Sequence, residues 1–529
     1  MAEIDRLKNL LSKGIISRRE FMVAAAAAGI SASSASLIVP SPAYAAPKRG
    51  GHFQLGLGAG STTDSLDPGR YLDIYMQTVG HSLHNFLTEV TEDGELVGEL
   101  AESWEASSDA TEWTFKLRKG VTFHNGKPLE AEDVVASFNH HRGEDSQSAA
   151  KGIVDPIKDI RADGKDTVVF TLEAGNADFS YITSDYHLPI MPSKDGKVDA
   201  TSGVGCGGYV LKKFDPGVET VVERNPDYWK DDRAWFDQIT FVAIKDVAAR
   251  TNALRTGQIH AMDRADLKTI NLLERDPSLN ILSVTGSQIY TVPMITTAEP
   301  FNDNNVRLAL KHAVDRQELV DKILQGYGRV GNDQPIGPSY RYHADLPQRE
   351  YDPEKAKHYL KKAGMDSLTV NLSASDAAFV GAVDAAVLYK EHAAKAGINI
   401  NVVREPSDGY WENVWMKKPW CMCYWSGRAT ADWMFSIAYA EDANWNDTDW
   451  KHDRFNKLLK EARSELDGNK RAEMYAEMQT IVRDEGGVAL PVFADYVNAA
   501  AKNVATGKIG NNWDMDGLRV AERWWFKDA

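Results

Sequence analysis

Residues 368–402 contain a strand, a helix and a second strand, and this pattern constrains the fold more than any other feature. Apolar residues alternate over 368–372 and again over 398–402, as they do in strands with one buried face. A helical segment runs between them from about residue 383 to 396 and stops at Gly397. Such a strand–helix–strand unit places its two strands parallel in one sheet. The sequence therefore predicts a mixed α/β fold.

Two further segments carry helix boundaries. Asp352 precedes a proline, which predicts an N-cap and a first helical turn, and Gly364 ends that helix. Asn302 is expected to cap a helix over 306–313, and the helix that follows should end at Gly326.

Length and charge exclude some classes of protein. The 529 residues are 43% hydrophobic and 26% charged, which is the balance of a globular chain with two or more domains. The formal net charge of −16 argues against a nucleic-acid partner, because contacts to phosphates need a concentrated basic face. We therefore expect no nucleic-acid partner.

The first 45 residues are typical of an export signal. Arg18 and Arg19 precede an Ala-rich, weakly apolar stretch, and Ala43-Tyr44-Ala45 matches an A-x-A cleavage site. This arrangement predicts a twin-arginine signal peptide over 1–45, cleaved after Ala45. The alternatives are an ordinary secretory signal with an incidental arginine pair and, less favoured, a retained membrane anchor. No later run of about 18 apolar residues exists, so we expect a soluble mature chain.

The three cysteines do not form a disulfide framework. Cys421 and Cys423 are too close in the chain for an unstrained bridge, and Cys206 is distant in sequence. On a strand Cys421 and Cys423 share a face, and we expect buried free thiols at these two positions.

Several segments occur in an order that is typical of one family. They are LAESWEASSDATEWTFKLRKGVTFHNGKPLEAEDVVASFN (100–139), GGYVLKKFDPGVETVVERNPDYW (207–229), ALRTGQIHAMD (253–263), FNDNNVRLALKHAVDRQELVDKILQGYG (301–328), YDPEKAKHYLKKAG (351–364) and RAEMYAEMQTIVRDEGGVALPVF (471–493). Together they resemble the extracellular solute-binding proteins of family 5, the peptide, nickel, opine and glutathione receptors of ABC importers. The resemblance covers essentially the whole chain after residue 45. We expect most residues of these segments to have structural roles. Trp113 and Phe115 have the spacing of a strand, and Asp215-Pro216-Gly217 is typical of a hairpin turn.

The resemblance implies an α/β fold of the two-lobe, hinge-bending periplasmic binding protein class (type II), with an extra subdomain in lobe 1. Lobe 1 is expected over 46–290, with the inserted subdomain at about 90–205, and lobe 2 over 291–488. Residues 489–529 return to lobe 1. The chain should cross between the lobes near 290–295 and 488–493.

The segment CYWSGRATADW (423–433) is the strongest candidate for a ligand site. In the family that it resembles, Trp425-Ser426-Gly427 matches a segment whose backbone pairs with an extended ligand, and the next position commonly holds an Asp that binds a peptide's amino group. Here that position is Arg428. Dipeptide receptors also carry a carboxylate-binding arginine in the loop that corresponds to 374–379, where this chain has none. Both differences argue against a plain zwitterionic dipeptide as the ligand.

Arg428 offers a forked donor for a carboxylate, and Asp432 or Asp376 could bind an amine. The alternative is that Arg428 and Asp432 form a surface ion pair of little energetic consequence. Residues 411–450 hold seven of the fourteen tryptophans, Trp411 and Trp425 among them. A buried core could use them, but so many rings are costly there unless their indole N–H groups find partners.

Other motifs contribute less to the predicted site. The glycines of Gly56-x-Gly58-x-Gly60 do not have the spacing of a phosphate loop, but they could let backbone approach a ligand beside the hydroxyls of Ser61 and Thr62. His81-x-x-His84 lacks further metal-binding residues nearby, so we expect no metal and no cofactor. No catalytic motif is present, so we expect no enzyme.

Three functional interpretations follow. The favoured one is a periplasmic receptor that captures a peptide or peptide-like small solute between two lobes and delivers it to the transmembrane subunits of an ABC permease, acting as a monomer. The second keeps the fold but changes the ligand to an opine, a glycoside or a metal chelate. The third is an exported cofactor enzyme, which the missing catalytic constellation disfavours.

Overall fold

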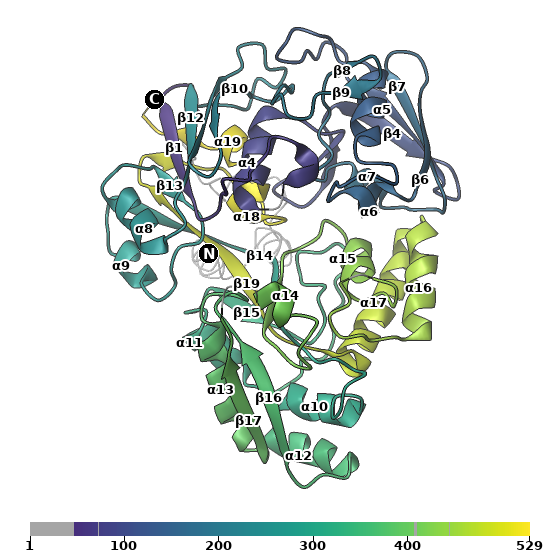
Figure 1. Ribbon diagram of the computed structural model, residues 1–529, viewed down its shortest axis with the longest axis vertical. Coiled ribbons are helices and arrows are strands. Elements are labelled where there is room, and N and C mark those ends of the chain that lie inside the picture. The colour runs from purple at the N-terminus through teal and green to yellow at the C-terminus, as the bar shows by residue number, and fades with distance from the viewer. Residues whose placement is uncertain (1–46, 72, 407–409, 444, 529) are drawn as a thin grey trace, which may run out of the picture. The chain divides into compact units, whose positions relative to one another are not determined.

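A nine-stranded sheet runs through the protein and is the frame on which the candidate site is built. Its order is β10-β11-β12-β1-β13-β19-β14-β18, with β15 paired to β19 off this path. β1 pairs in parallel with β12 and β13, and the other pairings are antiparallel. The strands are β1 (His52–Leu57), β10 (Tyr209–Asp215), β11 (Glu219–Arg224), β12 (Gln238–Ala243), β13 (Ala261–Met262), β14 (Leu279–Pro293), β15 (Gly328–Val330), β18 (Cys423–Trp425) and β19 (Val488–Ala501) (Figure 1).

The structure is a computed structural model that describes residues 47–71, 73–406, 410–443 and 445–528. The predicted twin-arginine signal of residues 1–45 lies outside the described residues and stays a prediction. Within the described part of the chain, no helix is both long and apolar enough to span a bilayer.

Separate hydrophobic cores divide the sheet along its two longest strands. One core draws on 53–261 and 500–526, whereas two others draw on 289–494. β14 and β19 pair with each other over most of their length, and their ends contribute to different cores: Val497 and Ala499 of β19 pack with Leu279, and Val492 packs with Val292. The fold is therefore the expected mixed α/β two-lobe class. The predicted crossings at 290–295 and 488–493 fall at these strands, and the lobe boundaries stay a prediction.

A smaller four-stranded sheet forms its own core within the part of the chain predicted as the inserted subdomain. Its antiparallel order is β4-β5-β7-β6, and Trp113, Phe115 and Leu117 are buried there as the sequence predicts. Its elements are β4 (Ala101–Ala106), β5 (Glu112–Leu117), β6 (Ile157–Ala162), β7 (Thr167–Leu172), α5 (Ala131–Asn139) and α7 (Phe179–Ile182).

The predicted strand–helix–strand unit is confirmed. β16 (Leu368–Ala374) and β17 (Ile398–Arg404) pair in parallel, with Leu368 opposite Ile398, and α13 (Ala382–Ala394) connects them. Gly397 has a φ of +75°, a left-handed conformation that favours glycine, which explains why the helix ends there.

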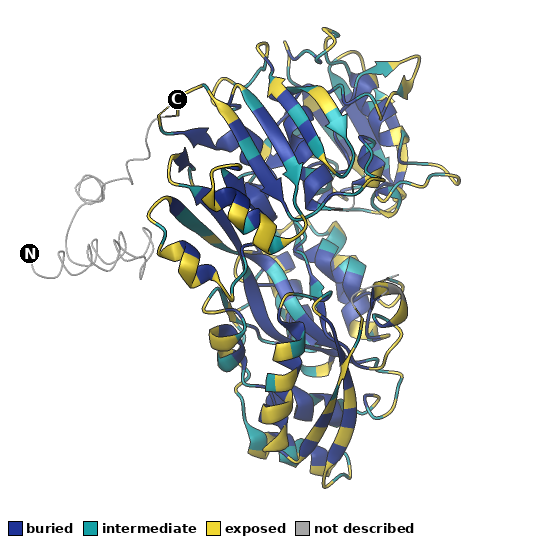
Figure 2. Ribbon diagram, turned by 60° about the vertical axis from the view of Figure 1, so that its left-hand side comes forward, coloured by how far each residue is buried: buried dark blue, intermediate teal, exposed yellow. Residues whose placement is uncertain are grey.

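The remaining helices surround these sheets, and Figure 2 shows many of them with one buried and one exposed face. They include α4 (Ile74–Leu83), α8 (Val247–Arg255), α9 (Ile270–Glu274), α10 (Asn304–His312), α11 (Arg316–Lys322), α12 (Pro353–Lys362), α14 (Tyr410–Asn413), α15 (Ala431–Ala438), α16 (Asp453–Ser464), α17 (Gly468–Glu485), α18 (Asp514–Gly517) and α19 (Val520–Arg523).

Two of the predicted helix starts can be compared with the structure. Asp352 caps α12 through a bond from the Lys355 N–H, as expected. The prediction that Asn302 caps α10 is wrong by one residue, because the Asp303 carboxylate accepts the Asn305 N–H instead. Asparagine and aspartate are about equally good N-caps, so sequence alone does not choose between neighbours.

A buried network of charges joins the inserted subdomain to the end of the chain. Three carboxylates (Glu89, Glu99, Glu522) meet three cations (Lys230, Arg519, Arg523), and each of these side chains is at most 9% exposed. Arg519 Nη1 lies 2.9 Å from Glu99 Oε1 and 3.0 Å from Glu522 Oε2. Burial alone would raise the pKa of Glu89, but Arg519 and Lys230 hold it well below its usual range.

The three cysteines are free and buried, as predicted for Cys421 and Cys423. Burial raises the pKa of each thiol, to about 12 for Cys206, so none is a ready thiolate at neutral pH.

Candidate ligand-binding site

Arg428 lies in the turn between β18 and α15. Its Nη1 donates hydrogen bonds to the carbonyls of Ser426 and Gly427, both at 3.0 Å, and its backbone N–H donates to the Tyr340 hydroxyl at 3.0 Å. The guanidinium carbon is 5.9 Å from the ring centres of both Trp425 and Trp433. Among the described residues, no carboxylate oxygen lies within 4 Å of this guanidinium. The charge is therefore held by carbonyls and aromatic faces, not by an ion pair.

A cavity of about 50 Å³ lies beside Arg428. Its wall combines segments that are far apart in sequence and that the prediction assigns to both lobes. They are Val90, Gly94, Asp178, Tyr181, Ser287, Ser339–Tyr342, Arg428–Ala431, Asn511 and Asn512. Since one water needs roughly 10–15 Å³ on this measure, the cavity has room for a few waters, not for a solute. A ligand here would require the walls to separate.

Asp432 is not free to bind a ligand amine in this conformation. Its carboxylate oxygens accept hydrogen bonds from Arg463 Nε at 3.2 and 3.3 Å, and the residue is buried at the start of α15. Burial raises the pKa of Asp432 to about 6, although Arg463 opposes this shift. The alternative of an Arg428–Asp432 ion pair is also not what the structure contains, because Asp432 binds Arg463.

Asp376 is exposed in the loop after β16, where it accepts the Gly381 N–H at 3.2 Å. The same loop carries Phe379, whose ring stacks on Tyr290 of β14 with centroids 3.8 Å apart and planes 6° apart. Asp376 thus caps the turn before α13, and the aromatic side chain is the one that reaches the central sheet.

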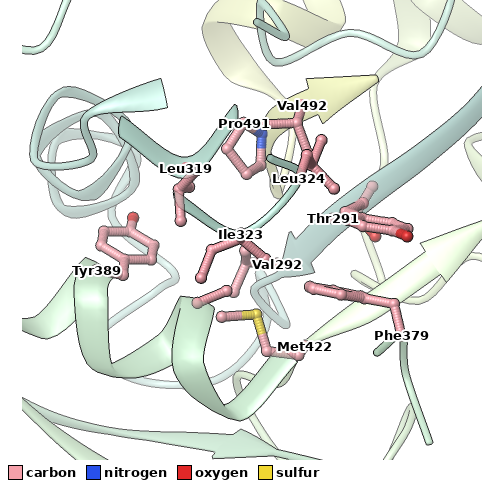
Figure 3. A pocket seen from close by; sticks show the side chains of 12 residues that line it. Thr291, Val292, Leu319, Ile323, Leu324, Phe379, Tyr389, Met422, Pro491 and Val492 are labelled. Carbon is pink, nitrogen blue, oxygen red and sulfur yellow. The ribbon is translucent and has the colours of Figure 1, made fainter. Parts of the chain in front are cut away.

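An apolar cavity of about 20 Å³ adjoins this stacked pair. Figure 3 shows side chains from α11, α13 and β14 and Met422 pointing toward one another around it. Its lining consists of Tyr290, Thr291, Val292, Leu319, Ile323, Leu324, Phe379, Ala385, Tyr389, Met422, Pro491 and Val492. Neither the cavity nor the stacked pair was predicted, because they join segments about ninety positions apart.

The backbone at 423–427 fits the pairing role that the resemblance implies. β18 is the last strand of its sheet, and among the described residues its own three positions pair only with β14. The residues directly before it also pair with β16, where the Met422 N–H donates to the Ser373 carbonyl at 2.9 Å. Trp425 is 7% exposed, and its Nε1–H donates to Asp447 Oδ2 at 3.2 Å. A Cβ at Gly427 would lie 1.5 Å from Ser287 Oγ, so only glycine fits there. Ser426 between them is half-buried.

A tryptophan cluster borders this edge. Trp411 of α14 is 36% exposed, and its ring contacts Trp415 edge-on at 5.8 Å and Tyr424 at 5.7 Å. Trp415 and Trp425 both donate to Asp447 Oδ2 at 3.2 Å. Burial raises the pKa of Asp447 to about 6, although these indole N–H groups oppose the shift. The indole partners expected for so many rings therefore include a buried carboxylate.

The glycine run near the start of the mature chain is explained by packing. A Cβ at Gly58 would lie 2.9 Å from the Arg250 guanidinium, and one at Gly56 would lie 2.5 Å from Ile259. These spaces are filled by protein, so the glycines need no ligand to account for them. Ser61 and Thr62 lie beyond the run at the surface, where the Ser61 N–H donates to Asp64 at 2.8 Å.

The structure thus brings Trp425, Ser426, Gly427 and Arg428 together in one turn, with Trp411 close to Tyr424. It commits Asp432 and Asp376 to other partners. Tyr340, which lines the cavity and accepts the Arg428 N–H, was missed, because it stands in no recognisable motif and its neighbours come from distant segments.

Comparison with known proteins identifies the class. A model of the bacterial extracellular solute-binding proteins, family 5, matches residues 95–447. The chain belongs to this family, whose members are solute receptors of ABC importers, periplasmic or extracellular, and are binding proteins rather than enzymes.

Individual relatives cover nearly the whole chain. Di/tripeptide-binding protein 1 of Pseudomonas aeruginosa (strain UCBPP-PA14) is 27% identical over 459 residues, which cover 79% of this chain and 85% of the relative. The structure of Helicobacter pylori DppA in complex with the peptide STSA has a TM-score of 0.76 at 23% identity and covers 91% of this chain and 99% of its own. AgaA from A. tumefaciens R10 in complex with agropinic acid has a TM-score of 0.75 at 24% identity, covering 90% of this chain and 99% of its own.

Proposed function

We propose that this chain is the periplasmic receptor of an ABC importer for a peptide-like solute that carries a carboxylate. The observation that carries this proposal is Arg428: a guanidinium without a carboxylate partner among the described residues, lining a cavity beside the free edge of β18. An extended solute would pair with the edge of β18 through its backbone, and its carboxylate would accept the remaining N–H groups of Arg428.

The residue type at 428 favours an acid over an amine. An arginine repels the amino group of a zwitterionic peptide, and Asp432 is already held by Arg463. A solute with a free carboxylate and no amine at that end fits better. This includes a peptide bound in the opposite direction and an opine-like acid, the class of the agropinic acid bound to AgaA.

We extend the proposal to closure. Arg471 of α17 binds Asp178 next to α7 in a bidentate pair, with both N···O distances at 2.8 Å and both side chains at most 6% exposed. In the predicted lobe division this pair joins lobe 2 to the inserted subdomain of lobe 1, as a contact of the closed form would. A solute that binds the closed form better shifts the population toward it.

The proposal also includes a monomeric protein without enzymatic activity, exported by the twin-arginine route and cleaved after Ala45. Arg18→Lys with Arg19→Lys should leave precursor in the cytoplasm. Normal periplasmic accumulation of that variant would instead indicate the general secretory route.

Mass spectrometry of the small molecules released when the purified protein is denatured tests the ligand class. We expect one or a few solutes, each with a free carboxylate. A neutral glycoside, or a metal chelate without a free carboxylate, as the bound species would contradict the proposed class.

A further inference from the structure

Arg264 occupies a strained position directly after β13. Its φ is +48°, in the left-handed region that residues other than glycine seldom adopt. The turn is held by the Arg264 N–H, which donates to Asn498 Oδ1 at 3.1 Å, and by the Ala265 N–H, which donates to the Val497 carbonyl at 2.8 Å. Strain of this kind persists where the surroundings impose it, often at binding sites.

The guanidinium of Arg264 makes only one long ion pair among the described residues. It is 58% exposed and donates no hydrogen bond to another described residue, and its nearest carboxylate oxygen, Asp263 Oδ2, is 3.8 Å from Nε. The guanidinium of Arg250, which also lies beside Asp263, is in contrast buried and paired. It is 3% exposed, lies 3.2 Å from Asp263 Oδ1 and donates to the carbonyls of Ile244 and Arg264.

Asp263 is only a partial counter-ion for Arg264. The carboxylate is buried, and its Oδ1 also accepts the Gly58 N–H at 2.8 Å. Burial raises the pKa of Asp263, although Arg264 and Arg250 oppose this shift.

Tyrosines of three strands lie within electrostatic range of Arg264. Tyr424 of β18 and Tyr496 of β19 both interact electrostatically with it, as does Asp514. Tyr290, which pairs with Tyr424 across β14 and β18, is also influenced by Arg264. The hydroxyls of tyrosines and the N–H groups of a guanidinium are together a donor set for an anion.

Two tyrosines, Tyr496 and Tyr340, connect the surroundings of Arg264 with those of Arg428. Tyr496 interacts with Arg264 and also with Tyr340, and the Tyr340 hydroxyl accepts the backbone N–H of Arg428. Ser287 lies between them, within reach of both tyrosine hydroxyls. A solute bound along the edge of β18 would therefore have one arginine near each end of its path.

We propose that Arg264 binds a second carboxylate of the solute, which makes the preferred ligand a dicarboxylic peptide-like acid. This inference rests on the proposed function, and it adds a specificity determinant that the sequence did not reveal. The planar fork of a guanidinium matches a carboxylate, and the neighbouring tyrosine hydroxyls can donate to the same oxygens.

The test is equilibrium dialysis of the protein against an enzymatic casein hydrolysate of di- and tripeptides, with mass spectrometry of the retained peptides. Peptides with Asp or Glu are compared with their Asn or Gln counterparts, which differ in one charge. Wild type should favour the acidic member of each pair. In Arg264→Asn the ratio of affinities for the acidic and the neutral peptide of each pair should fall by roughly 10- to 30-fold, at tenfold per 1.4 kcal/mol. The variant should still bind peptides.

Matched variants guard against a general effect on folding. Asparagine tolerates the left-handed conformation, so Arg264→Asn should fold, and Arg264→Lys should keep part of the preference. Arg255→Asn is the control. Arg255 ends α8 and is 56% exposed, and its Nε lies 3.9 Å from Asp276. This is a similar surface pairing, without tyrosines among the described contacts. This variant should behave as wild type.

Each outcome decides between the two proposals. If wild type binds peptides without an acidic preference, or Arg264→Asn keeps the preference, the inference about Arg264 is wrong and the proposed function stands. If wild type retains no peptide at all, the inference that Arg264 selects dicarboxylic peptides is wrong, and peptides are removed from the proposed ligand class. The opine-like acids of that class are tested separately by identifying the co-purified solute.

Discussion

Two groups of arginines in this protein have opposite environments. In the buried network, Arg519 and Arg523 are saturated by Glu89, Glu99 and Glu522. Beside β18 the contrast is clear: the Arg428 guanidinium donates hydrogen bonds only to backbone carbonyls, and the Arg264 guanidinium donates none to a described residue. Charged groups that stabilise a fold are paired within it, because an unpaired buried charge is costly. Charges left without partners beside aromatic groups are available to a ligand.

This contrast predicts that disrupting the network mainly lowers stability. Glu99→Gln leaves Lys230 and Arg519 without one buried partner, so the free energy of unfolding should fall by roughly 3–5 kcal/mol. Chemical denaturation followed by circular dichroism measures this. Glu223→Gln, whose exposed partner is Lys212, is the control and should cost less than about 1 kcal/mol. Equal effects of the two substitutions would remove the distinction.

Substitution of Arg428 should have the reverse effect, weakening solute binding more than it lowers stability. Arg428→Ala should weaken binding of the co-purified acid by roughly 30-fold or more, equivalent to about 2–5 kcal/mol, because its carboxylate loses a desolvated partner. Stability without solute should fall by no more than about 2 kcal/mol, since the half-buried side chain gives up two carbonyl hydrogen bonds and its contacts with two tryptophan rings. Isothermal titration calorimetry and thermal melts measure the two quantities.

Two controls sharpen the Arg428 prediction. Arg428→Lys should recover part of the affinity, because an ammonium keeps the charge but not the fork. Arg454→Ala removes an exposed arginine that pairs with Glu477 on a distant helix, and it should bind as wild type. Wild-type affinity in Arg428→Ala would make Arg428 a surface residue.

A smaller effect concerns pH and the buried carboxylate between the tryptophans. The pKa of Asp447 is about 6 in the folded protein and near 3.8 when unfolded, so the folded state binds more protons between these values. The contribution of Asp447 to the free energy of unfolding therefore falls as pH rises from about 4 to 6 and is constant above. The free energy of unfolding of Asp447→Asn relative to wild type should therefore rise across this window by on the order of 3 kcal/mol, at about 1.36 kcal/mol per pKa unit.

Thermal melts of wild type and Asp447→Asn from pH 4 to 8 measure that difference. Asp442→Asn, in an exposed position five residues earlier, should show a flat difference across the same range. A difference for Asp447→Asn that does not vary with pH would show that the carboxylate titrates normally.

Much of the fold could be predicted because it depends on local patterns. Alternation over 368–372 and 398–402, the Asp352 cap and the glycine at 397 each act within a few residues, and each is confirmed. The Asn302 error arose where two good caps are adjacent. Segment order then indicated the family, which no single pattern could.

The candidate site was only partly predictable. The turn at 425–428 was found because its residues are consecutive. The partner of Asp432 is Arg463, thirty-one positions away, and Arg264 meets tyrosines from β14, β18 and β19, so their environments depend on tertiary packing. The glycines at 56–60 were expected to let the backbone approach a ligand, but side chains of Arg250 and Ile259 occupy the space beside Gly58 and Gly56.

A crystal structure of the protein with its co-purified solute tests the central claim most directly. The account predicts a carboxylate oxygen of the solute about 2.7–2.9 Å from a guanidinium nitrogen of Arg428, with the solute lying along the free edge of β18. A solute bound elsewhere, or one whose uncharged end faces Arg428 while the guanidinium keeps only the Ser426 and Gly427 carbonyls, would contradict it.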